Sequence, residues 1–137
     1  MRSAPNHQVE RSLQGEFLWR LKRYPLLALT TPNGLFIPSR TDEERRMRAR
    51  LINRMKAEQM LLPGMPDLVL LWEDGAALVE TKRPAFKNIF GYHPAGTASE
   101  DQQEFARRAA ALGINHAYCS SWHDLEDHLR CWGVEPR

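Results

Sequence analysis

Three charged residues lie at the ends of two neighbouring apolar segments. Asp67 precedes the apolar run LVLLW, and Glu80 and Lys82 close the next run, AALVETK. Side chains two positions apart on a strand point to the same face, so Glu80 and Lys82 are expected to project together. The pair Asp74-Gly75 between the runs is typical of a tight hairpin, which brings Asp67 near them. The pattern predicts two carboxylates and one ammonium group at one end of a hairpin.

These groups suit metal-assisted hydrolysis of a phosphodiester bond. Asp67 and Glu80 supply the oxygen ligands that Mg²⁺ prefers, and the backbone carbonyl of Thr81 is a further candidate ligand. A bound divalent metal polarises a phosphate and generates hydroxide from water. Lys82 would orient that water or stabilise the developing negative charge. Mg²⁺ or Mn²⁺ is the expected cofactor.

The same residues also have an interpretation without catalysis. Glu80 and Lys82 could form a solvent-facing ion pair, and Asp67, which follows a proline, could be a turn residue. The succession of GxPD, strand, hairpin, strand and ExK, followed by a long segment rich in Gly and Pro, favours the metal site.

Three segments together resemble the VRR-NUC domain of the PD-(D/E)xK nuclease superfamily: GMPDLVLL, LVETK and SEDQQEFARRAAALG. The resemblance covers nearly the whole chain. It implies a single stand-alone nuclease domain over residues 1–137, of the phage and bacterial type. The implied fold is an α/β, restriction-endonuclease-like core with a central mixed β-sheet flanked by helices. The implied function is that of a metal-dependent endodeoxyribonuclease, a homodimer that acts on branched DNA such as Holliday junctions.

The resemblance assigns Asp67, Glu80 and Lys82 to the metal-binding aspartate and the ExK motif of the family. It also adds an early helical glutamate among the metal ligands, which Glu10 matches because Leu13-Gln14 follow at the family's spacing. Glu10 precedes Leu13 by three residues, on the helix side expected to face the core. Without a catalytic role, Glu10 would be an exposed carboxylate in the first turn of the helix, where it interacts favourably with the helix dipole.

Glu16 is the alternative to Glu10 for the same position. Gln102 matches a glutamine that opens a helix at the rim of the family's active site, where it contacts the metal-bound water or the phosphate. Ser99 and Gln102 also fit a capping box, so helix capping alone would explain this glutamine. Gln103 is its neighbouring alternative.

Basic residues are candidates for contacts with DNA phosphates, which supply most nonspecific affinity. The candidates are Arg45, Arg46, Arg48, Arg50, Arg54 and Lys87. A solvated helix face explains such a run as well, and a formal net charge of +2 does not by itself indicate nucleic acid. Phe90 and Tyr92 follow the ExK motif and could stack on unpaired bases, but packing onto the core is the favoured expectation.

Periodicity and turn residues predict alternating helices and strands in an α/β domain with a mixed sheet. A capping box at Thr41 and Glu44 opens the second helix. That helix is expected to bury a stripe of Met47, Leu51, Ile52 and Met55. Helices are expected at 8–23, 41–59, 99–112 and 123–132, strands at 26–31, 67–72, 76–83 and 114–120, a turn at Asn33-Gly34 with a strand at 35–37, and a long loop at 84–98.

Composition argues against several other classes of protein, including membrane, secreted and zinc-binding proteins. No apolar run approaches the roughly 20 residues that span a bilayer, and the N-terminus has no signal-peptide pattern, so a cytoplasmic protein without membrane contact is expected. Cys119 and Cys131 are expected to be reduced and mostly buried, and the scattered histidines give no zinc motif. The competing classes are a catalytically inactive DNA-binding module with a degenerate nuclease fold and an unrelated α/β binding protein.

Overall fold

The computed structural model describes residues 5–31, 41–57 and 64–137. The turn expected at Asn33-Gly34 and the strand expected at 35–37 lie outside the described residues. The other expected helices and strands are present, within three residues of the expected ends. In chain order the elements are α1 (Pro5–Leu21), β1 (Leu27–Thr30), α2 (Asp42–Ala57), β2 (Leu68–Trp72), β3 (Gly75–Thr81), β4 (Phe86–Asn88), β5 (Gly91–His93), α3 (Glu100–Ala111), β6 (Asn115–Cys119) and α4 (Trp122–Cys131).

The main sheet has the strand order β1-β2-β3-β6. The first three strands are antiparallel, and β6 runs parallel to β3. Trp72 pairs with Gly75, so the turn of the β2–β3 hairpin consists of Glu73 and Asp74 rather than the expected Asp74-Gly75. A side chain at position 75 would collide with the Trp72 ring. Glycine at this position, where β3 begins, leaves room for the ring. The sheet is mixed, as the sequence predicts.

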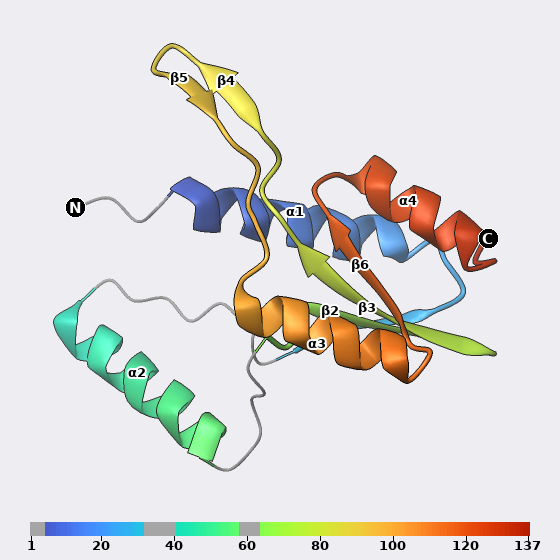
Figure 1. Cartoon of the computed structure of the whole chain (residues 1–137), viewed down its shortest axis with the longest axis horizontal. Helices are drawn as coiled ribbons and strands as arrows, with labels where there is room; N and C mark the ends of the chain where they lie inside the picture. Colours follow the sequence, from blue (N-terminus) through green and yellow to red (C-terminus); the bar gives the residue numbers. More distant parts are fainter. Residues whose placement is uncertain (1–4, 32–40, 58–63) are drawn as a thin grey trace.

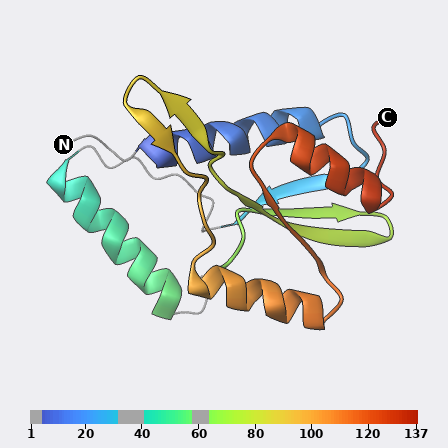
Figure 2. The ribbon, with the colours of Figure 1, turned by 45° about the horizontal axis from the view of Figure 1, so that its top comes forward.

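Helices cover both faces of this sheet (Figure 1). In both views, α1 and α4 lie on one side of the sheet and α3 lies on the other (Figure 2). The alternation of apolar residues along β2 and β3 directs one set of side chains toward α1 and α4, where they form the core. The largest fully buried apolar side chains are Phe17, Leu21, Leu68, Leu70, Val79, Leu125 and Leu129.

Helix α2 begins with the expected capping box. The Glu44 amide donates to Thr41 Oγ1 at 3.1 Å, and the Thr41 amide donates to Glu44 Oε2 at 3.3 Å. The expected buried stripe is wrong for Met47 and Leu51, which are exposed because α2 lies apart from the sheet in both views (Figure 1). The side chains of Ile52 and Met55 lie outside those that the structure describes.

The expected long loop at 84–98 instead contains a two-stranded ribbon formed by β4 and β5. At its tip, Asn88 Oδ1 accepts a hydrogen bond from the Phe90 amide at 2.8 Å. Gly91 has a φ of 117°, which only glycine adopts without strain. Phe90 and Tyr92 are exposed, so the expectation that they pack onto the core is wrong. The ribbon is long enough to hold them away from the sheet (Figure 1).

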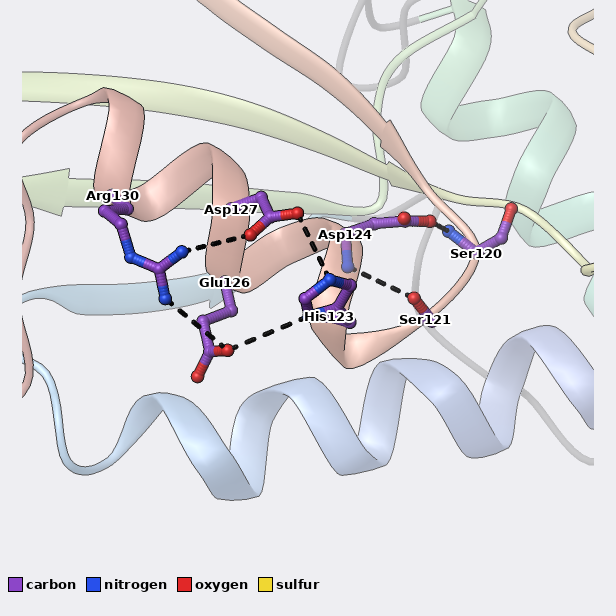
Figure 3. A network of polar contacts seen from close by, with 7 residues as sticks. All are labelled: Ser120, Ser121, His123, Asp124, Glu126, Asp127 and Arg130. Atoms are coloured by element: carbon purple, nitrogen blue, oxygen red, sulfur yellow. Dashed lines mark hydrogen bonds and ion pairs between the residues drawn. The ribbon is translucent and has the colours of Figure 1, made fainter.

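The last helix carries a polar network on its own surface (Figure 3). The Asp124 amide donates to Ser121 Oγ, which caps α4, and the Ser120 amide donates to the Asp124 carboxylate. Further along α4, Asp127 pairs with both His123 and Arg130. These contacts join residues within one helix and its cap, so they stabilise α4 and do not form a site.

Both cysteines are free, as expected. Cys119 is buried, but Cys131, the last residue of α4, is exposed, contrary to expectation. Among the helices that the structure describes, none is both long and apolar enough to cross a membrane.

Candidate active site

Glu80 lies near the end of β3, with only 2% of the residue exposed. Burial is the largest cause that raises the pKa of its carboxyl group to about 9, and the neighbouring Asp67 carboxylate adds to the effect. Lys82 acts in the opposite direction, and Glu10 raises the pKa further. Oε2 of Glu80 is buried and accepts no hydrogen bond from a donor among the described residues, and a side-chain hydrogen bond between Glu80 and Asp67 is a further cause of the raised pKa. Burial of a carboxyl beside other carboxylates costs stability, and carboxyls with shifted pKa values cluster at functional sites.

Asp67 is held in place by Thr81. Oδ2 of Asp67 accepts hydrogen bonds from the Thr81 amide at 2.9 Å and from the Thr81 hydroxyl at 2.7 Å. The Thr31 amide donates to the Asp67 carbonyl at 3.0 Å, and the Thr31 hydroxyl donates to the Pro66 carbonyl. Thr31, directly after β1, and Thr81, at the end of β3, therefore fix the dipeptide Pro66-Asp67 from both sides. The Asp67 carboxylate consequently lies at the end of β3.

Gln102 connects the two members of the ExK motif. Its side-chain amide nitrogen donates to Glu80 Oε1 at 3.0 Å, and its Oε1 accepts from Lys82 Nζ at 2.6 Å. Lys82 Nζ also donates to the Thr97 carbonyl at 3.3 Å. Among the described residues, Glu80 and Lys82 are linked through Gln102 and not by a direct ion pair, and Glu80 is buried. The interpretation of the motif as a solvent-facing ion pair is therefore wrong.

The capping role of Gln102 coexists with these contacts. The Gln102 amide donates to Ser99 Oγ, and the Ser99 amide donates to Gln102 Oε1, so the expected capping box is present. Gln103, the alternative, donates to the Ala98 carbonyl and makes no contact with Glu80 or Lys82. Gln102 therefore both begins α3 and lies in the cluster.

The first helix contributes Glu10, as expected. Oε1 of Glu10 accepts a hydrogen bond from the Arg83 amide at 3.3 Å, and its charge raises the pKa of Glu80. Glu16, the alternative, pairs with Arg20 at 3.2 Å on the surface of α1. Glu10 therefore lies at the end of β3, and Glu16 does not.

The donor set fits a hard divalent cation in part. Buried Oε2 of Glu80 accepts no hydrogen bond from a donor among the described residues, and the Glu80 carboxyl lies close enough to Asp67 to form a side-chain hydrogen bond with it. Two carboxylates completed by water are a usual binding site for Mg²⁺. Among the described residues, no three His, Cys, Asp or Glu side chains form a group arranged to hold a metal. Glu10 and the Thr81 carbonyl stay predicted ligands.

The basic residues do not join this cluster. Arg45 pairs with Asp42 at 3.0 Å, while Arg46, Arg50 and Arg54 are exposed on α2. The side chain of Arg48 lies outside the described set. Lys87 is exposed on β4. These residues lie on α2 and β4, which contribute nothing to the cluster, and contact with DNA stays a prediction for all of them.

Sequence reasoning missed three supporting contacts. The hydroxyl of Thr81 orients Asp67, and the hydroxyl of Tyr118 donates to the Gln102 carbonyl at 3.3 Å. Tyr118 pairs with Glu80 across β3 and β6, a register that the separate strands do not reveal. Gly64, with a φ of 74°, lies against the first turn of α3, where a Cβ would be 2.2 Å from the Asp101 carbonyl. The glycine of the GxPD motif is the sequence signal that could have indicated this close approach to α3.

Comparison with known proteins adds no family: no protein-family model, curated protein or solved structure matches this chain. The fold and the site define a mixed α/β protein with an acidic cluster, a lysine and a glutamine at one end of its central sheet.

Proposed function

We propose that this protein is a Mg²⁺- or Mn²⁺-dependent endodeoxyribonuclease of the PD-(D/E)xK type. The observation that carries the proposal is the arrangement at the end of β3. There the buried Glu80 carboxyl lies beside Asp67, and Gln102 links it to Lys82. A carboxyl with a strongly shifted pKa that lies with a second carboxylate and a lysine is a recognised mark of an active site.

Asp67 and Glu80 would hold the metal, and Glu10 and the Thr81 carbonyl are the proposed additional ligands. When bound, the cation supplies Lewis-acid polarisation of the phosphate and a more acidic water. At neutral pH, the raised pKa keeps a proton on Glu80 in the metal-free protein. Binding of a cation would therefore release this proton, as deprotonated ligands require.

The protein's own groups have distinct roles in this proposal. Lys82 places a positive charge beside Glu80 and would stabilise the negative charge that develops on the scissile phosphate. Gln102 is a positioning residue, because it holds Lys82 Nζ and Glu80 Oε1 on either side of one amide. The hydrogen bonds from Thr81 to Asp67 hold that carboxylate in a single orientation.

The proposed superfamily assignment has support from topology. Asp67 directly precedes β2, ExK lies at the end of β3, and α3 later leads to β6, which is parallel to β3. This order agrees with the expected restriction-endonuclease-like core. Branched DNA as substrate and a homodimer as the active form rest on the VRR-NUC resemblance alone.

The alternative is an inactive DNA-binding module built on the same fold. The observation in its favour is the lack, among the described residues, of a three-membered metal-binding group. The retained Asp67, Glu80 and Lys82 favour the enzyme.

A cleavage assay distinguishes these functions. Labelled four-way junction, flap and duplex DNA are incubated with Mg²⁺ or Mn²⁺, or with EDTA, and the products are separated by electrophoresis. We expect metal-dependent cleavage that Asp67→Ala abolishes and Glu16→Ala retains, because Glu16 lies on α1 outside the cluster. Cleavage that persists in EDTA or in Asp67→Ala would contradict the proposal, and junction binding without cleavage would favour the inactive module.

A further inference from the structure

The β4–β5 ribbon is attached directly to the candidate active site. Four residues separate the end of β3 from Phe86, where the ribbon begins. On the returning side, the Gly96 amide donates to the Arg83 carbonyl at 2.7 Å, and the Thr97 carbonyl accepts from Lys82 Nζ. A Cβ on Gly96 would be only 3.3 Å from the Arg83 amide nitrogen, so glycine permits this close approach. Both ends of the ribbon are therefore fixed beside Lys82.

The ribbon's tip exposes large apolar side chains. Ile89 is 93% exposed, Phe90 is 85% exposed and Tyr92 is 69% exposed. Figure 1 shows the ribbon projecting beyond the sheet, and Figure 2 places it near the first half of α1. Single exposed apolar residues are common, but several gathered on one projecting tip mark an interaction surface. The rings of Phe90 and Tyr92 are therefore largely accessible to a binding partner.

The charge of the ribbon indicates which partner it fits. Residues 84–98 contain Lys87 but no Asp or Glu. At the base, Arg83 is 8% exposed, and its Nε and Nη1 have no hydrogen-bond partner among the described residues. Its guanidinium group lies 5.5 Å from the centre of the Phe86 ring. Positive charge combined with exposed rings, without carboxylates, is the combination that binds unpaired bases of a nucleic acid.

We propose that the β4–β5 ribbon is an arm that binds unpaired nucleobases. Phe90 and Tyr92 stack on the bases, and Lys87 contacts a phosphate. The proposal rests on the proposed nuclease function and specifies its substrate class: DNA in which unpaired bases adjoin a duplex. The arm then places the junction between paired and unpaired DNA near Lys82, since the base of the arm lies there.

The test measures binding without cleavage. The full chain in EDTA is titrated, at one salt concentration, against a labelled duplex with a short bulge of unpaired thymines and against a fully paired duplex of equal length. We expect Phe90→Ala/Tyr92→Ala to weaken binding to the bulged duplex by about tenfold or more. Binding to the paired duplex is expected to change by less than about twofold, because stacking needs an accessible base face.

Two further variants separate stacking from general apolar contact. Ile89→Ala removes the most exposed apolar side chain of the tip without removing a ring, and we expect it to bind both DNAs as the wild type does. Phe90→Trp keeps a ring and is expected to retain the preference for the bulge. Equal weakening on both DNAs, an equal effect of Ile89→Ala, or unchanged binding by the double variant would overturn the proposal. Self-association or binding to anionic vesicles that depends on Phe90, without a bulge preference, would also overturn it.

The binding and cleavage measurements distinguish a failure of the arm proposal from a failure of the nuclease proposal. Metal-dependent cleavage with no ring-dependent bulge preference would refute the arm alone. A ring-dependent preference in a chain that never cleaves DNA would refute the nuclease alone.

Discussion

The side-chain amide of Gln102 donates a hydrogen bond to Oε1 of Glu80, with a donor–acceptor distance of 3.0 Å. The same amide group accepts from Lys82 Nζ at 2.6 Å and closes the capping box with Ser99. The start of α3 and the charged cluster at the end of β3 are therefore parts of one hydrogen-bonded arrangement. A glutamine that only caps a helix would not contact Glu80 or Lys82.

Gln102→Ala is predicted to slow cleavage by about 10- to 100-fold, the usual effect of removing a residue that orients metal ligands. Ser99→Ala is the control for capping, because it removes the cap acceptor but leaves the contacts to Glu80 and Lys82. Both variants should lose about 1 kcal/mol of stability, measured by denaturant unfolding. Equal cleavage rates in the two variants would show that Gln102 acts only as a cap. Gln103→Ala should behave as the wild type does.

Gly64→Ala is predicted to impair both stability and cleavage. Its φ of 74° disfavours any side chain, and a Cβ would overlap the Asp101 carbonyl and approach the Gln102 amide. The strain alone costs on the order of 1–3 kcal/mol, and relief of the overlap must shift the first turn of α3. Gly15→Ala, which meets nothing within 4 Å in α1, is the matched control and should stabilise the chain slightly. Wild-type melting and cleavage in Gly64→Ala would disprove the proposed packing.

Glu80→Gln is predicted to stabilise the metal-free protein, and more strongly as pH rises. The pKa of Glu80 is about 9 in the folded protein, against an ordinary value of 4.5, because of burial and the adjacent Asp67. The folded state therefore holds a proton that the unfolded chain releases, and the wild type loses stability as pH rises from about 4.5 to about 9. An uncharged glutamine removes this loss.

Thermal melts in EDTA at pH 5, 7 and 9 measure this effect. The melting temperature of Glu80→Gln should exceed that of the wild type by the largest margin at pH 9, with roughly 3–6 °C for each 1 kcal/mol gained. Glu16→Gln is the control, because Glu16 is a surface carboxylate paired with Arg20. A margin that stays constant or shrinks with rising pH would argue against a buried, protonated Glu80.

Arg46→Ala/Arg50→Ala is predicted to weaken binding to paired and branched DNA by the same factor. Both residues are exposed on α2, and phosphate contacts carry no sequence or shape preference. The slope of log affinity against log salt concentration should fall by about 1 for each phosphate-binding arginine that is replaced. Arg130→Ala, on α4 and paired with Asp127, serves as control. An unchanged salt slope in the double variant would exclude α2 from the DNA interface.

Local patterns predicted much of this architecture. The two-residue strand period placed Glu80 and Lys82 together, and the Asp-Gly pair predicted the hairpin that brings Asp67 to them. Glu10, which the structure places near the end of β3, was selected by the resemblance to the VRR-NUC pattern and not by a local signal. The first two features depend on neighbours in the sequence, so a single chain reveals them.

Other features depend on tertiary placement. Helical periodicity in α2 indicates an apolar stripe but not what covers it, and Met47 is exposed. The glycines and prolines of 84–98 indicate turns, yet the strands between them formed a projecting ribbon. Tyr118 reaches Gln102 only because β6 pairs with β3 in one particular register.

The most direct test of the central claim compares Lys82→Ala and Glu80→Ala with the wild type on a four-way junction in Mg²⁺. Circular dichroism first establishes that each variant is folded, and Lys22→Ala, which changes an exposed lysine directly after α1, is the matched control. We predict that Lys82→Ala and Glu80→Ala each lower the cleavage rate by at least about 100-fold, while Lys22→Ala cleaves at a rate similar to that of the wild type. Undiminished cleavage by either Lys82→Ala or Glu80→Ala would contradict the assignment of this cluster as a nuclease active site.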